Sequence, residues 1–86
     1  MISKTDNTRE KLAEYAHSAW AGWMNYMFSF CTVDENGNCI IPKEKFDRWD
    51  RQRRTLYAQL PENEKKSDRE EADKILDIIK STEKDK

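Results

Sequence analysis

The residues of this sequence that could carry out acid-base, nucleophilic or metal chemistry are few and scattered. The one histidine, His17, lies far along the chain from the two cysteines, Cys31 and Cys39. Catalysis needs a nucleophile with a base, paired carboxylates in a pocket or a metal cluster, and these residues match none of those patterns. Two thiols and one distant imidazole also lack the four-ligand spacing of a structural zinc site. We therefore expect a protein without enzymatic activity, cofactor or metal.

An acidic segment near the middle of the chain invites comparison with a calcium loop. Asp34, Asn36 and Asn38 occupy the first three ligand positions of an EF-hand loop. The glycine required at the sixth position is Cys39, however, and the glutamate required at the twelfth is Lys45. Asp, Asn and Gly between two short apolar runs are typical of a turn. We predict a turn-rich loop or a small hairpin here.

Basic and aromatic side chains gather between positions 43 and 54. Six basic residues outnumber three acidic ones there, and Trp49 and Tyr57 lie in or just after the segment. Guanidinium groups beside aromatic rings suit the phosphate and the base of a nucleotide. The alternative is a solvated helix face on which Asp47 pairs with Arg51 and Asp50 pairs with Arg54.

A long amphipathic helix is predicted from about Thr8 to Phe30. Apolar residues recur there at intervals of three and four, namely Leu12, Ala16, Ala19, Trp20, Trp23, Met27 and Phe30. The second half of this helix is apolar nearly all round, because Met24, Tyr26 and Phe28 widen its apolar face. Such a surface needs cover from other elements or from another copy, so we expect a homo-oligomer.

Two further helices complete the predicted fold. Pro42 can open the second near Lys43, with Phe46, Trp49, Leu56 and Tyr57 along an apolar side that Arg53 interrupts. Leu60-Pro61 restarts the chain into the third, in which Ala72, Ile75, Leu76 and Ile79 should face inward. The expected fold is mainly α: a small three-helix domain with a turn-rich loop or short hairpin between its first two helices. We expect residues 1–86 to form one domain, with 1–7 and 81–86 as flexible tails.

Charge and hydropathy limit the partners of the chain. The formal net charge of -1 creates no overall field toward nucleic acid or anionic lipid. The charged start of the chain is unlike a secretory signal, and the longest apolar run, Ala19 to Cys31, is shorter than the roughly 20 residues of a membrane span. We expect a reduced, cytoplasmic protein that has no membrane partner.

Two groups of residues, one near each end of the chain, form a pattern known from a protein family. His17 and Trp20 lie three positions apart on the predicted first helix. The element Tyr-x-x-Leu-x-x-x-Glu-Lys-x-x-Asp-Arg leads into the last helix, with Tyr57, Leu60, Glu64, Lys65, Asp68 and Arg69. This pattern resembles the RyR domain, a module named for repeats in ryanodine receptors. The chain departs from that family in its middle, because Gly22-Trp23 falls inside the predicted first helix. The chain is also similar to a group of short phage and prophage proteins.

The resemblance implies a function as well as a pattern. RyR-type domains have no known catalytic activity, and their bacterial and phage relatives are suspected of recognising nucleotide-derived signals used in antiviral defence. It therefore implies a non-enzymatic protein that sequesters such a signal in the cytoplasm of an infected or lysogenic bacterial host. The expected ligand-binding residues are His17, Trp20, Trp23, Trp49, Tyr57, Arg51, Arg54, Asp68 and Arg69.

Two other hypotheses belong to different functional classes. In one, the chain is a small phage interaction protein that inhibits a host defence enzyme, or another enzyme, by protein-protein contact. In the other, Arg48, Arg51 and Arg54 bind nucleic acid, which predicts an affinity that falls steeply with salt. The overall acidity of the chain makes nucleic acid the weakest of the three.

Overall fold

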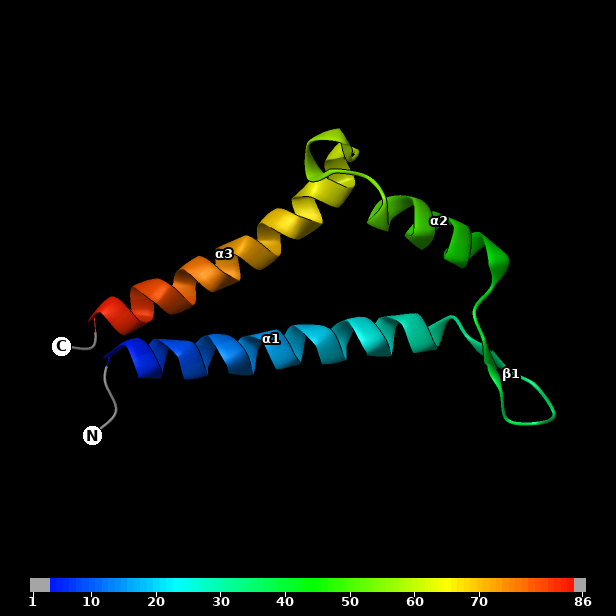
Figure 1. The fold of residues 1–86 in the computed structure, drawn as a ribbon, viewed down its shortest axis with the longest axis horizontal. Coiled ribbons are helices and arrows are strands. Elements are labelled where there is room, and N and C mark those ends of the chain that lie inside the picture. The colour runs from blue at the N-terminus through cyan, green and yellow to red at the C-terminus, as the bar shows by residue number, and fades with distance from the viewer. Residues whose placement is uncertain (1–3, 85–86) are drawn as a thin grey trace. The chain divides into compact units, whose positions relative to one another are not determined.

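A computed structural model describes residues 4–84 of the chain. Within this range the elements follow one another as α1 (Lys4–Ser29), β1 (Thr32–Val33), β2 (Cys39–Ile40), α2 (Lys43–Arg53), the short 3₁₀ helix η1 (Tyr57–Gln59) and α3 (Glu62–Lys84) (Figure 1). The mainly α fold with three helices is confirmed, and the connection between the first two helices is a short hairpin.

The first helix is longer at its start than the apolar spacing predicted. α1 begins at Lys4, and it ends at Ser29, whose hydroxyl donates a hydrogen bond to the carbonyl of Tyr26 at 2.6 Å. The backbone N–H groups of Phe30 and Cys31 donate to carbonyls three residues back, each at 3.1 Å. These short-range bonds tighten the last turn and take up carbonyls that a continuing helix would have used.

The hairpin confirms the turn chemistry of the acidic segment. Thr32 pairs with Ile40 and Val33 with Cys39 in an antiparallel register. The Asp34 carboxylate accepts hydrogen bonds from the backbone N–H groups of Asn36 and Asn38, both at 2.9 Å, and from the Asn38 side-chain amide at 3.1 Å. The backbone N–H of Asn38 contributes most to lowering the pKa of Asp34 below its ordinary value of 3.8. The loop therefore folds around this carboxylate.

The second helix is shorter at its end than predicted. Pro42 precedes α2, and its carbonyl accepts bonds from the N–H groups of Lys45 and Phe46 at 3.0 Å. At the other end the Thr55 hydroxyl donates to the carbonyl of Arg51 at 2.7 Å, and Leu56 is already extended, with φ -64° and ψ 145°. Leu56 and Tyr57, which were expected on the apolar side of this helix, therefore lie beyond it.

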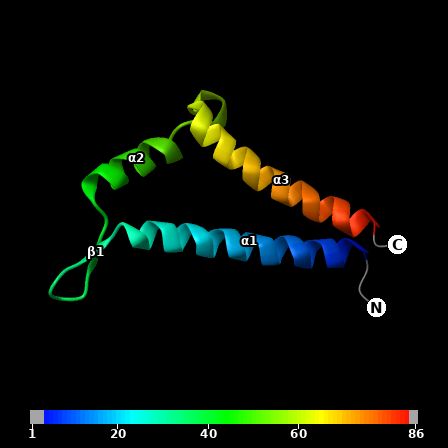
Figure 2. The same ribbon diagram turned by 180° about the vertical axis from the view of Figure 1, so that it is seen from behind.

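The chain divides into two compact units, which are described separately. The terminal unit contains the chain up to Ala19 and from Pro61 onward, and the central unit contains residues Trp20–Leu60. α1 passes through both units, while α3 belongs to the terminal unit and the hairpin, α2 and η1 to the central one (Figures 1 and 2). The predicted tails fall partly outside the described residues, and inside them residues 4–7 continue α1 and 81–84 continue α3.

Few side chains are fully buried. Among residues 6–83, whose side chains the structure describes, Leu60 is the buried apolar residue at 8% exposure, and Glu64 and Thr82 are the buried polar ones. On α3, Ile75 and Leu76 have the spacing of an inward-facing side, but they are 38% and 49% exposed, so neither is buried. In the central unit Leu60 is the buried apolar residue, so most of the packing there has to come from the partly exposed aromatic residues.

Candidate functional site

A pocket of about 320 Å³ lies between the second half of α1 and α2, entirely within the central unit. Six side chains line it: Trp23, Met24 and Met27 from α1, and Trp49, Gln52 and Arg53 from α2. Its volume is at the small end of the range of about 300–1,000 Å³ that ligand pockets occupy. Four large apolar side chains with two polar ones is the composition of a small-molecule site.

Aromatic contacts fix the positions of the two pocket tryptophans. Trp23 packs edge-on against Tyr26, with ring centroids 5.7 Å apart. On the α2 side, the Trp49 ring lies 6.2 Å from Tyr26 and 6.1 Å from Phe30. Tilted and edge-to-face pairs of this kind contribute about 0.5–1.5 kcal/mol each beyond their buried area. Tyr26 therefore links both tryptophans, and the cluster joins α1 to α2.

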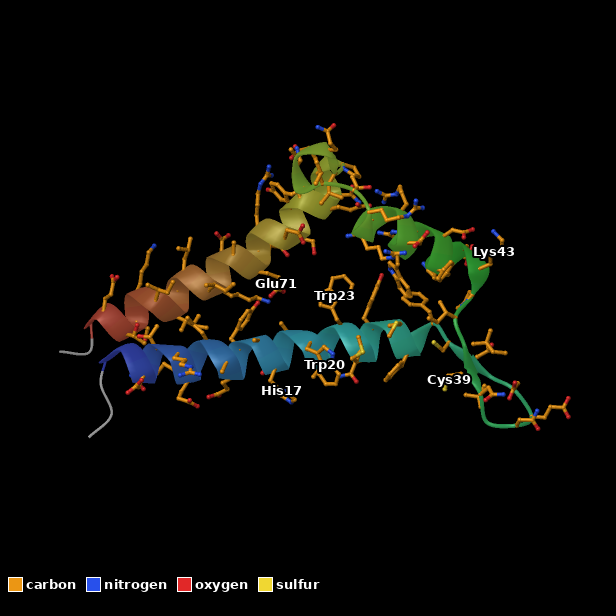
Figure 3. The ribbon with its side chains drawn as sticks, in the orientation of Figure 1. His17, Trp20, Trp23, Cys39, Lys43 and Glu71 are labelled. Atoms are coloured by element: carbon orange, nitrogen blue, oxygen red, sulfur yellow. The ribbon has the colours of Figure 1, made fainter. Side chains whose placement is uncertain are left out.

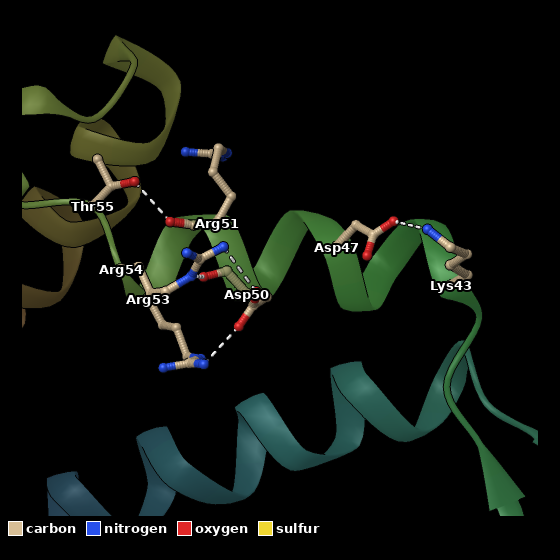
Figure 4. A network of polar contacts seen from close by, with 7 residues as sticks. All are labelled: Lys43, Asp47, Asp50, Arg51, Arg53, Arg54 and Thr55. Carbon is tan, nitrogen blue, oxygen red and sulfur yellow. Dashed lines mark hydrogen bonds and ion pairs between the residues drawn. The ribbon is translucent and has the colours of Figure 1, made fainter.

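Two arginines share one carboxylate beside the pocket. Asp50 pairs with Arg53 at 2.7 Å and with Arg54 at 3.0 Å, and Arg54 also donates through Nε to the Asp50 carbonyl at 3.3 Å (Figure 4). The pairing of Asp50 with Arg54 was predicted from their spacing and is confirmed. Two guanidinium groups around one carboxylate leave one net positive charge. Because Arg53 lines the pocket, this charge lies where it can attract an anionic group.

The start of α2 carries a separate ion pair. Lys43 donates to Asp47 at 2.6 Å, and this hydrogen bond raises the pKa of Lys43 above its ordinary value of 10.5. Arg51 and Arg53 extend from opposite sides of α2 (Figure 4). Of the two arginines expected to contact the ligand from this segment, Arg54 shares the Asp50 carboxylate with the pocket residue Arg53, whereas Arg51 extends from the other side of α2.

The structure brings together two of the four aromatic residues expected in the central part of the site. Trp23 and Trp49 both line the pocket. Trp20 and Tyr57 belong to the same unit but do not line it, and they are 59% and 48% exposed. In Figure 3, Trp20 extends from the lower edge of α1 and Trp23 from the upper edge. The expectation that all four contact a ligand came from the resemblance to the RyR domain and from the basic and aromatic segment of the second predicted helix.

The other predicted site residues lie in the terminal unit. His17 is exposed on α1, and Asp68 and Arg69 are exposed on α3. Arg69 pairs with Glu62 at 3.1 Å, two helical turns back, and Lys65 lies 3.8 Å from the same carboxylate. The Arg69–Glu62 pair is exposed on both sides, and pairs of that kind typically contribute about 0–1 kcal/mol. These pairs stabilise the start of α3, where acidic side chains also favour the helix N-terminus.

Sequence reasoning missed four lining residues. Met24 and Met27 were assigned only to the apolar face of α1, although their spacing from Trp23 places all three on neighbouring positions of one helix. Arg53 was noted as an interruption of the apolar side of α2. This interruption of an apolar face could have marked Arg53 in the sequence. Gln52, the fourth, gave no such signal.

The described part of the chain contains no metal-ligand cluster, and its two cysteines are not joined by a disulfide. No three His, Cys, Asp or Glu side chains between residues 4 and 84 come together as metal ligands. Cys31 and Cys39 are free thiols. Across the same residues, no helix combines the length and the apolar character needed to cross a bilayer.

Comparison with known proteins adds no relative. No family model matches the chain, and neither the curated proteins nor the solved structures contain a significant match. The likeness to the RyR domain therefore rests on the residues of the sequence pattern alone. The fold and the pocket define a small helical protein with an aromatic pocket between α1 and α2.

Proposed function

We propose that this chain is a non-enzymatic protein that binds a nucleotide-derived small molecule and sequesters it, as a phage protein acting against a host defence signal in the bacterial cytoplasm. The observation that carries the proposal is the pocket between Trp23 and Trp49 with Arg53 at its edge. The nucleotide class and the defence role also rest on the residues shared with the RyR domain.

The pocket suits a base. Stacking of a nucleic-acid base on an aromatic side chain contributes about 1–3 kcal/mol, and Trp23 and Trp49 offer two indole rings. Met24 and Met27 are unbranched and polarizable, so they can adapt to the outline of a flat ligand. The amide of Gln52 has both a donor and an acceptor, which are the groups needed to bind the edge of a base.

The edge of the pocket suits a phosphate. Arg53 is 72% exposed and Arg54 is 64% exposed, whereas the Asp50 carboxylate they share is 22% exposed. A phosphate can therefore approach the two guanidinium groups from solvent while Asp50 still holds them in place. Planar guanidinium groups bind phosphate oxygens in pairs, which gives both affinity and orientation.

The lining residues favour binding over catalysis. Tryptophan, methionine, glutamine and arginine provide shape, stacking and hydrogen bonds, but none of them exchanges a proton near neutral pH. General acid-base chemistry needs a group that does. Holding a ligand without converting it is what a sequestering protein requires.

The proposal is tested by isothermal titration with a panel of cyclic nucleotides and ADP-ribose derivatives. Arg53→Gln removes the charge at the pocket and should weaken binding about tenfold or more, because hydrogen bonds to charged groups contribute about 1.5–3 kcal/mol. Arg48→Gln is the matched control, since Arg48 is an exposed arginine of the same helix that does not line the pocket. Equal losses in both variants would indicate a general charge effect and count against the pocket.

Native mass spectrometry separates this proposal from its alternative. A nucleotide released from freshly purified protein would support sequestration directly. Protein that carries no small molecule and binds no member of the panel would favour the other class, an inhibitor that acts on an enzyme by protein-protein contact.

A further inference from the structure

One half-buried side chain of the pocket offers both a hydrogen-bond donor and an acceptor. Gln52 lies on α2 and lines the pocket together with Trp49 and Arg53 of the same helix. The backbone carbonyl of Gln52 accepts from the N–H of Thr55 at 3.2 Å. In the described part of the chain, no group forms a hydrogen bond with its side-chain amide. This amide is therefore available to a ligand.

The spacing of these three lining residues on α2 matches three parts of a nucleotide. Trp49 lies three positions before Gln52 and four before Arg53, so the three side chains are neighbours on the helix surface. A base that stacks on the Trp49 indole can present an edge to the Gln52 amide, while the phosphate reaches Arg53 at the pocket edge. Stacking accepts any base, because every base has a flat π-face. The choice of base is left to the amide.

The lining favours the least polar of the nucleobases. Apart from Gln52 and Arg53, the lining side chains are tryptophans and methionines, and Arg53 is paired with Asp50 at 2.7 Å. A buried polar group without a partner costs free energy, so each carbonyl group of a bound base would need a donor here. Adenine has no carbonyl group. Its exocyclic amine donates, and the neighbouring nitrogen of its five-membered ring accepts, so one amide can satisfy this edge.

We propose that Gln52 selects the base and that the ligand is an adenine nucleotide, an inference that rests on the proposed function. The amide oxygen of Gln52 accepts from the exocyclic amine, and the amide nitrogen donates to the nitrogen of the five-membered ring. Glutamine reads adenine in DNA through the same two bonds. Hypoxanthine has a carbonyl oxygen in place of the amine, so on this edge one of the two bonds is lost whichever way the amide is turned.

The test is isothermal titration of the full chain with pairs of ligands that differ in the exocyclic group of the base. The pairs are cyclic AMP with cyclic IMP, and ADP-ribose with its hypoxanthine analogue. The wild type should bind the adenine form at least about fivefold more tightly, which is the lower limit for a two-bond contact to a base. Gln52→Met keeps the length of the side chain but removes the amide, so it should abolish this preference.

Gln59→Met is the matched control, because Gln59 is an exposed glutamine of η1 that does not line the pocket. A second variant, Gln52→Arg, offers donors only. Because the carbonyl and the ring nitrogen of hypoxanthine both accept, Gln52→Arg should reverse the preference toward the hypoxanthine form. The ratio of the two affinities is the readout, since the added charge acts equally on the phosphate of both forms. Circular dichroism checks that each variant keeps its helices.

A preference for adenine that is lost in Gln52→Met and kept in Gln59→Met supports the inference. A wild type that binds both forms equally, or a Gln52→Met variant that keeps the preference, overturns it and leaves the proposed function standing. A wild type that binds neither form of either ligand overturns both.

Discussion

Truncation of Trp49 should weaken the central unit more than any other single aromatic substitution on α2. Its ring packs against Tyr26 and Phe30, at 6.2 and 6.1 Å between centroids, and lines the pocket as well. Full burial would make Trp→Ala cost about 3–5 kcal/mol. Because Trp49 is only half-buried, we expect about 2–3 kcal/mol for Trp49→Ala, with the two ring contacts included. In a small domain this lowers Tm by about 10–20 °C.

The measurement is thermal and urea unfolding followed by circular dichroism, at one fixed protein concentration. Phe46→Ala is the control, because Phe46 is an aromatic residue of the same helix that is 54% exposed. It should change the free energy of unfolding by less than about 0.5 kcal/mol, as most surface substitutions do. If Trp49→Ala and Phe46→Ala destabilise the protein equally, the aromatic cluster does not join α1 to α2 as argued above.

Three further outcomes follow from the structure. In an NMR titration the amide signals of Asn36 and Asn38 should report a midpoint below pH 3.8, because the hydrogen bonds of the loop lower the pKa of Asp34. The stability that the carboxylate gives the hairpin is present above this range and is lost as pH falls through the lowered pKa. A midpoint at or above 3.8 would contradict this reasoning. Asp34→Asn should abolish the same transition. Thr55→Val removes the hydroxyl that donates to Arg51 and should destabilise α2 by about 0.5–1 kcal/mol in urea unfolding, so an unchanged midpoint would show that this bond does not hold the helix end.

The pattern of apolar residues was sufficient for the three helices, since the interval of three and four residues in Leu12, Ala16 and Ala19 is a local property of the helix. It was less informative at the helix ends. α2 stops at Arg53 because the Thr55 hydroxyl and the N–H of Thr55 take carbonyls of its last turn. Such short-range competition leaves little trace in apolar spacing, which continued as far as Tyr57.

The candidate site was only partly visible in the sequence. Aromatic and basic residues on the second predicted helix drew attention to Trp49 and to the arginines around it. The pocket depends in addition on which residues of α1 face α2, and these are Trp23, Met24 and Met27 rather than Trp20. A helix that is apolar nearly all round does not itself indicate which of its sides is covered.

The sequence by itself determined the elements and the turn chemistry of this protein, because helical periodicity, the proline at position 42 and the Asp34 loop act over a few neighbouring residues. Only the tertiary structure decided which side chains are buried and which are brought together. Ile75 and Leu76 have the spacing of a buried face and yet are exposed, while Arg53 interrupts an apolar face and lines the pocket. Burial is a property of two packed surfaces, and one helix encodes only one of them.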